Sequence, residues 1–109
     1  MIRLIVTAND ALYDRLDTQA RAEGDSARRA TDVLDGYRQA RTLQQEAVII
    51  VDMSLHTADT LLEALHSRQA TAHIPLLAIQ CDHRPLPLAL RRLCTDVLEA
   101  DTLRPMDTL

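Results

Sequence analysis

The residue whose position most suggests chemistry is Asp52, which directly follows four apolar β-branched residues, VIIV at 48–51. An uninterrupted apolar run predicts a strand covered on both faces, as in a parallel sheet flanked by helices. Ligands of such sheets bind where the strands end at their carboxyl edge, and we expect Asp52 at that edge. A lone Asp at the end of a strand is also a common acceptor of hydrogen bonds from loop amides, so both interpretations stay open.

Three further candidate ligands are expected on loops at the same edge, namely His56, Asp82 and His83. Together with Asp52 they offer the nitrogen and oxygen donors that Zn²⁺ binds, or the start of an anion site. Their spacing is neither that of a helix nor that of a hairpin, so no local structure arranges them in advance. The alternative is that these histidines are ordinary exposed loop residues.

All twelve basic residues are arginines, and the chain has no lysine. Three of them, Arg84, Arg91 and Arg92, lie on or near a helix expected at 86–93. The guanidinium group pairs well with carboxylates and phosphates. This cluster could therefore contact acidic groups of a partner or of a second subunit, bind a phosphate-bearing nucleotide, or form an ordinary solvated face.

The composition excludes several classes of function. A net charge of −4 argues against direct nucleic-acid binding, and no apolar run approaches the ~20 residues of a membrane span. The sequence contains no nucleophile elbow or paired Cys/His motif, and two glycines leave little for a phosphate-binding loop, so we expect no enzyme. Cys81 and Cys94 fit small buried residues in a reducing compartment, and without a signal-peptide pattern we expect a cytoplasmic protein.

Strand and helix patterns alternate along the chain. Strands are expected at 2–6, 26–30, 48–51, 76–80 and 96–100, and helices at about 10–22, 32–44, 57–69 and 86–93. In a chain of 109 residues this alternation predicts one α/β domain with a parallel sheet and right-handed crossovers. The second strand, SARRA, is short and polar, which is typical of a sheet edge.

Residues 2–104 resemble a response-regulator receiver domain, the flavodoxin-like module of two-component signalling. The resemblance rests on IRLIV at 2–6, Gly24 before the weak second strand, VIIVDMSL at 48–55 and HIPLLAIQC at 73–81. It implies three layers around a five-stranded sheet of order 2-1-3-4-5, with helices 1 and 5 on one face and helices 2, 3 and 4 on the other. We expect residues 105–109 to be a C-terminal stub, or the start of a truncated or missing fifth helix.

The same resemblance implies a phosphorylation site with Asp52 as the acceptor. In the family, an acidic pair after the first strand joins the acceptor in holding Mg²⁺, which neutralises charge during phosphoryl transfer. The pair aligns with Ala8-Asn9 or, one residue later, with Asn9-Asp10. At best one carboxylate of the pair is present, which leaves Asp10 and Asp52 as weak candidates for Mg²⁺ ligands.

Other positions of the implied site also depart from the family pattern. Gln80 stands where the family has Ser or Thr after the fourth strand, and Val97 stands where it has an aromatic residue. The family's lysine aligns with Ala100 or, in another register, with Arg104 before Pro105, which keeps the charge with a different geometry. We therefore expect a degenerate receiver that does not use the standard phosphorylation switch.

The leading prediction for function is a pseudo-receiver. It would be a bacterial signalling module without a cofactor, acting by protein contact and homodimerisation on an attached or separate output domain. A sheet face left bare by a short fifth helix would favour such pairing. The alternatives are an atypical receiver phosphorylated on Asp52 with Mg²⁺, a STAS-like regulatory domain with Thr57 as phosphosite, and a small-ligand sensor. Strand order separates the STAS-like domain from the others.

Overall fold

A computed structural model describes residues 1–43, 46–80 and 86–99 of the chain. Five strands alternate with four helices. The strands are β1 (Ile2–Val6), β2 (Ser26–Ala30), β3 (Ala47–Asp52), β4 (Leu76–Gln80) and β5 (Asp96–Glu99). The helices are α1 (Asp10–Ala22), α2 (Val33–Ala40), α3 (Ala58–Ser67) and α4 (Leu88–Arg91). None of the helices described is long and apolar enough to cross a lipid bilayer.

The five strands form one parallel sheet in the order β2-β1-β3-β4-β5. β1 lies between β2 and β3, with Val6 opposite Ala30 on one side and Val51 on the other. This is the order expected from the receiver resemblance, and it excludes the STAS-like alternative. The fifth helix and residues 105–109 lie outside the described residues, so the prediction made for them stays a prediction.

Three helices are shorter than the sequence pattern predicted, and α3 ends at Ser67 rather than near residue 69. α2 ends at Ala40 rather than near residue 44, and α4 is a single turn from Leu88 to Arg91 rather than a helix from 86 to 93. Pro87 accounts for the late start of α4, because the residue before a proline is disfavoured in helical conformation. The inward side of this segment is as expected, since Leu86 is buried and Leu90 and Leu93 pack on the core.

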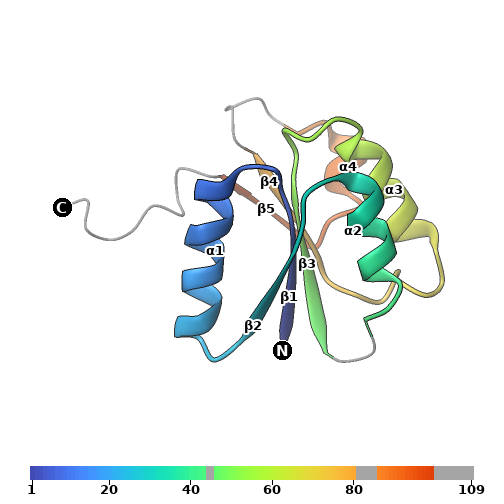
Figure 1. The fold of residues 1–109 in the computed structure, drawn as a ribbon. Helices are drawn as coiled ribbons and strands as arrows, with labels where there is room; N and C mark the ends of the chain where they lie inside the picture. The colour runs from blue at the N-terminus through green and yellow to red at the C-terminus, as the bar shows by residue number, and fades with distance from the viewer. Residues whose placement is uncertain (44–45, 81–85, 100–109) are drawn as a thin grey trace.

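The helices cover the sheet in two unequal layers. α1 lies on one face, and α2, α3 and α4 lie on the other (Figure 1). The core on the three-helix face is the larger and includes Leu4, Val6, Ile49, Val51 and Leu62. The core on the α1 face is built from Ile5, Leu12, Leu16, Ile50 and Ile79. β1 and β3 contribute to both cores, which is why their sequences are mostly apolar, with Arg3 as the exception within β1.

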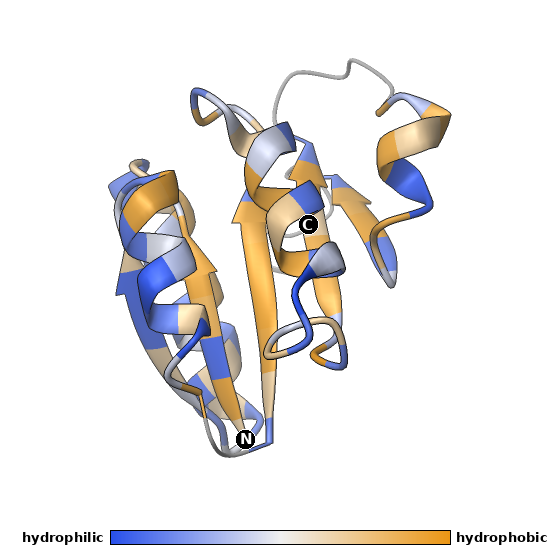
Figure 2. Ribbon diagram, turned by 90° about the vertical axis from the view of Figure 1, so that its right-hand side faces the viewer, coloured by the Kyte–Doolittle hydropathy of each residue, from blue (hydrophilic) through white to orange (hydrophobic). Residues whose placement is uncertain are grey.

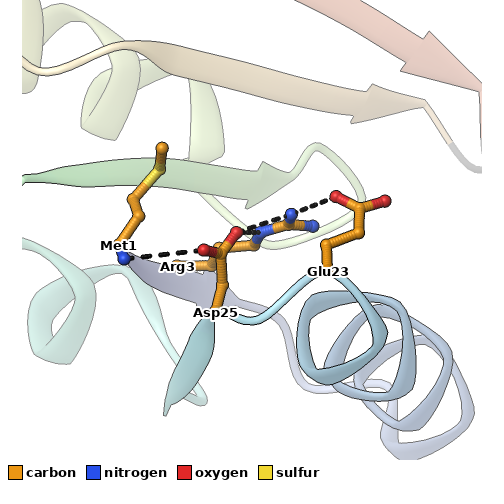
Figure 3. Close-up of polar contacts among 4 residues, drawn as sticks. All are labelled: Met1, Arg3, Glu23 and Asp25. Atoms are coloured by element: carbon orange, nitrogen blue, oxygen red, sulfur yellow. Dashed lines mark hydrogen bonds and ion pairs between the residues drawn. The ribbon is translucent and has the colours of Figure 1, made fainter.

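β2 forms one edge of the sheet, as its polar sequence predicted. Its residues alternate between exposed and partly buried until Ala30, which is fully buried. Its amino end is tied to β1 by a group of charges. Arg3 of β1 donates from Nε to Asp25 Oδ2 at 2.9 Å and also pairs with Glu23, and the amino group of Met1 lies 3.5 Å from Asp25 Oδ1 (Figure 3).

This cluster predicts a dependence of stability on pH. The hydrogen bond from Arg3 lowers the pKa of the Asp25 carboxyl below its ordinary value. The stabilisation is therefore complete above the unfolded-state pKa of about 3.9 and is lost as the pH falls through the lower folded-state pKa. Asp25→Asn is expected to flatten the decline of the melting temperature below about pH 4.

The control for this measurement is Asp17→Asn. Asp17 pairs with Arg21 on the surface of α1 at 3.0 Å, and the Arg21 side chain is 76% exposed. Because exposed pairs contribute little to stability, this variant should keep the acid slope of the parent chain. Equal slopes for Asp25→Asn and the parent would contradict the prediction.

Candidate functional site

Asp52 lies at the carboxyl edge of the sheet, as predicted, but its side chain is not open to solvent. Only 2% of the residue is exposed. Oδ2 accepts a hydrogen bond from Thr7 Oγ1 at 2.6 Å. Oδ1 accepts from the backbone N of Ser54 at 2.9 Å and from Ser54 Oγ at 2.7 Å. Both carboxylate oxygens are therefore held by hydrogen-bond donors from neighbouring loops.

Thr7 is the site residue that the sequence analysis missed. It follows β1 directly, is fully buried, and donates its backbone N–H to the Ala30 carbonyl at 2.9 Å. Its Oγ1 also accepts from the backbone N of Asn9 at 3.0 Å, so it links Asp52 to the start of α1. The strand register contained the signal: Val6 pairs with Val51, which places the next residues, Thr7 and Asp52, side by side.

The residues aligned with the family's acidic pair have other roles. Asn9 caps α1, because its Oδ1 accepts from Leu12 N at 3.1 Å. Asp10, in the first turn of α1, forms an ion pair with Arg29 of β2, with 2.8 Å between Oδ1 and Nη2. The Arg29 guanidinium also lies 5.1 Å from the centre of the Tyr13 ring. Ala8 is exposed and has no polar side chain to offer.

Several predicted site residues lie elsewhere or outside the described residues. Gln80 is the last residue of β4 and pairs with Glu99 of β5. Asp52 pairs with Ile79, the residue before Gln80. His56 is exposed on the loop after β3, and Arg91 and Arg92 are exposed at α4. Within the described ranges, no three His, Cys, Asp or Glu residues are grouped so that they could hold a metal ion. The predicted residues that fall outside those ranges are Asp82, His83, Arg84, Ala100 and Arg104.

Thr57 precedes α3 in a left-handed backbone conformation, with φ 60° and ψ 25°. It occupies the N-cap position of α3, but its hydroxyl donates to the His56 carbonyl at 2.5 Å and makes no capping bond to the helix. A β-branched residue in this region carries about 1–3 kcal/mol of strain.

Thr57→Gly is therefore expected to raise the free energy of unfolding by up to about 1 kcal/mol, because the relief of strain exceeds the entropic cost of glycine. Chemical denaturation measures this difference. The control is Thr60→Gly on the exposed side of the first turn of α3, which should lower the free energy of unfolding by up to about 0.5 kcal/mol. A loss of stability in both variants would show that Thr57 is not strained.

We compared the chain with known proteins. No protein-family model and no curated protein matches its sequence. Among solved structures it is similar to the CheY-like receiver domain from Methylobacillus flagellatus, with a TM-score of 0.79 and 17% identity over 91% of this chain and 85% of that one. It is also similar to the receiver domain of sensor histidine kinase PA1611 from Pseudomonas aeruginosa, which has a magnesium ion coordinated in its active site cleft. The TM-score is 0.73, with 16% identity over 90% of this chain and 83% of that one. For NtrX from Brucella abortus the TM-score is 0.77, with 18% identity over 94% of this chain and 24% of that one.

The chain has the fold of a response-regulator receiver domain. The site that this receiver fold implies is a cation held by carboxylates at the ends of the first and third strands. The described residues there do not fit that group. Thr7 places a hydroxyl against Asp52 where a carboxylate is required, and the Asp10 carboxylate is paired with Arg29. Mg²⁺ prefers anionic oxygen ligands, and a hydroxyl that donates to Asp52 offers it none.

Proposed function

We propose that this chain is a pseudo-receiver, a signalling module that acts through protein contacts and not by conventional phosphorylation of Asp52. The observation that carries the proposal is the hydrogen bond of 2.6 Å from Thr7 Oγ1 to Asp52 Oδ2. This hydrogen bond engages one carboxylate oxygen of Asp52 in a structural contact. It also means that the neutral side chain of Thr7 lies directly beside Asp52.

The charges near the site support this reading. Phosphoryl transfer to a carboxylate requires cations that neutralise the charge on the transferred group. Arg29, the cation described beside the loop after β1, is occupied by Asp10 and the Tyr13 ring. The chain contains no lysine that could pair with the phosphoryl group. Asp52 is 2% exposed, so a dianionic phosphoryl group on it would depend on such cations, and among the described residues at this edge Arg29 is already paired.

The surface that we propose for a partner is the exposed side of α4. Arg91 and Arg92 are exposed there, next to Leu88, of which 64% is exposed. Arginines around an apolar residue suit a protein surface that carries carboxylates. The partner is an attached output domain, a separate protein or a second copy of the chain. NtrX, in which the matching region is 24% of the chain, is an example of a receiver fold within a longer protein.

The experiment that tests the proposal is a titration of the ¹⁵N-labelled chain with Mg²⁺ and beryllofluoride, a mimic of the phosphoryl group. We expect no change in the amide spectrum and no adduct in the intact mass after treatment with a phosphodonor. The atypical-receiver alternative predicts shifts that spread from Asp52, Thr7 and Asp10. If such shifts occur and are absent in Asp52→Asn, the pseudo-receiver proposal is overturned.

The homodimer is tested separately by sedimentation velocity over a range of protein concentrations. We expect association that Arg91→Glu weakens, because the substitution reverses a charge on the proposed surface. A monomer at every concentration would remove the second copy as the partner and leave the output domain or a separate protein.

A further inference from the structure

The side chain of Arg29 joins the edge strand β2 to the carboxyl edge of the sheet. β2 is the hydrophilic strand at one edge, beside the more apolar strands β1 and β3 (Figure 2). Arg29 Nε donates to the Thr7 carbonyl at 3.3 Å, and Nη2 lies 2.8 Å from Asp10 Oδ1. The guanidinium carbon lies 5.1 Å from the centre of the Tyr13 ring, and 26% of the Arg29 side chain is exposed. Arg29 therefore connects β2 both to the loop after β1 and to the first turns of α1.

The contact with the Thr7 carbonyl extends the pairing of β1 with β2. Val6 pairs with Ala30, the last residue of β2, and the Thr7 N–H donates to the Ala30 carbonyl at 2.9 Å. Because β2 ends there, the Thr7 carbonyl lies beyond the last paired residues, and Arg29 donates to it from a side chain. A buried carbonyl requires such a donor. Gln39 of α2 holds Arg29 in turn, since its Nε2 donates to the Arg29 carbonyl at 2.8 Å.

Thr7 transmits this restraint to Asp52. Thr7 Oγ1 donates to Asp52 Oδ2 at 2.6 Å and accepts from the Asn9 amide at 3.0 Å. Asp52 Oδ1 accepts from the Ser54 amide at 2.9 Å. A continuous chain of contacts therefore runs from Arg29 across the carboxyl edge to the loop before α3. Because Thr7 is fully buried and Asp52 is 2% exposed, a shift of the Thr7 backbone would break a buried hydrogen bond, which is costly.

We propose that Arg29 is a positioning residue, which holds Thr7 against Asp52 because its guanidinium is anchored by the Asp10 carboxylate. A guanidinium is charged at every physiological pH, and its planar array of donors can serve a carbonyl and a carboxylate at once. The cation that orders the loop after β1 is then part of the chain itself. This role of Arg29 rests on the proposed function, because a pseudo-receiver has to hold Asp52 with its own residues.

The test is the exchange of backbone amide hydrogens with solvent, followed by NMR on the ¹⁵N-labelled chain. Arg29→Met keeps the length of the side chain and removes its charge and its donors. We expect the protection factors of the Asn9 and Ser54 amides to fall at least about tenfold, because each amide donates to a member of this chain of contacts. The fall at Ser54 is the decisive one, since Ser54 lies on the other loop, beyond Asp52.

The matched control is Arg28→Met, which makes the same change of charge at the neighbouring position of β2. Arg28 is exposed, and in the part of the chain that the structure describes it forms no ion pair or side-chain hydrogen bond. Its substitution should leave both protection factors unchanged. The experiment contains neither a divalent cation nor a phosphodonor, so a negative result would remove the role of Arg29 and leave the pseudo-receiver proposal standing.

A distant amide and two further variants separate positioning from a general loss of stability. The Leu76 amide, which donates to Thr95 Oγ1 at the other end of the sheet, should keep its protection in Arg29→Met. Arg29→Lys keeps the charge and should retain part of the protection at Ser54. If Arg29→Met does not fold, Asp10→Asn replaces it, because the Asp10 side chain is 85% exposed, and a fall of about threefold is expected at Ser54. Unchanged protection at Ser54 in the folded variants, or an equal fall at Leu76, overturns the proposal.

Discussion

Replacing Thr7 with aspartate is expected to make the stability of this chain depend on Mg²⁺. The new carboxylate would lie beside Asp52, at the place from which Thr7 Oγ1 now donates at 2.6 Å. Two negative charges would then share a site in which Asp52 is only 2% exposed. Burying an uncompensated charge costs about 3–5 kcal/mol, so the variant should unfold at a much lower temperature in EDTA.

Mg²⁺ should restore a large part of this loss, because the two carboxylates together form the anionic ligand pair that the natural site lacks. At a Mg²⁺ concentration of 100 times the dissociation constant, the recovery is expected to be about 2.7 kcal/mol. Thermal unfolding with and without Mg²⁺ measures it. The matched control is Thr7→Asn, which has the same shape as the aspartate variant and no charge. Its melting temperature should be the same with and without Mg²⁺.

Two results would change the conclusions. If Thr7→Asp melts at the same temperature in EDTA and in Mg²⁺, Thr7 is not the position that decides cation binding. If the unmodified chain itself gains stability in Mg²⁺, the hydrogen bond between Thr7 and Asp52 is displaced by the cation, and the pseudo-receiver proposal fails.

The second large effect is expected at Gly36, where α2 packs closely against Val6 of β1. A Cβ atom added at Gly36 would lie 2.9 Å and 3.0 Å from the two methyl carbons of Val6 and 3.5 Å from Leu61 Cδ2. Alanine gains about 1 kcal/mol in helix propensity over glycine, but overpacking of a core costs about 1–3 kcal/mol. Gly36→Ala should therefore lower the free energy of unfolding by up to about 2 kcal/mol, as measured in urea.

The contact with Val6 can be isolated by a double-mutant cycle. Val6→Ala alone leaves a cavity and is destabilising, but it removes the methyl groups that the new Cβ would meet. In the Val6→Ala background, Gly36→Ala should become neutral or stabilising, because only the gain in helix propensity is left. The same loss of stability in both backgrounds would show that the close approach of α2 to β1 is not the cause.

The elements of this protein could be predicted from its sequence because each has a local cause. Apolar runs, continuous in β3 and β4 and interrupted by Arg3 in β1, predicted these three strands, and the polar sequence SARRA predicted the edge strand β2. The alternation of strands and helices predicted a parallel sheet, and the resemblance to receivers supplied the strand order that is observed. Helix ends were predicted less well, since the length of α4 depends on Pro87 and on how little of the segment packs on the sheet.

The character of the candidate site was decided by the tertiary structure. Thr7 and Asp52 are separated by 45 positions, and only the pairing of β1 with β3 brings the hydroxyl to the carboxylate. The sequence indicated Asp10 as a candidate cation ligand, whereas in the fold Asp10 forms an ion pair with Arg29 of β2. Local sequence determines which segments become strands and helices, whereas the partners of each side chain follow from strand register and layer packing, which arise only when distant segments meet.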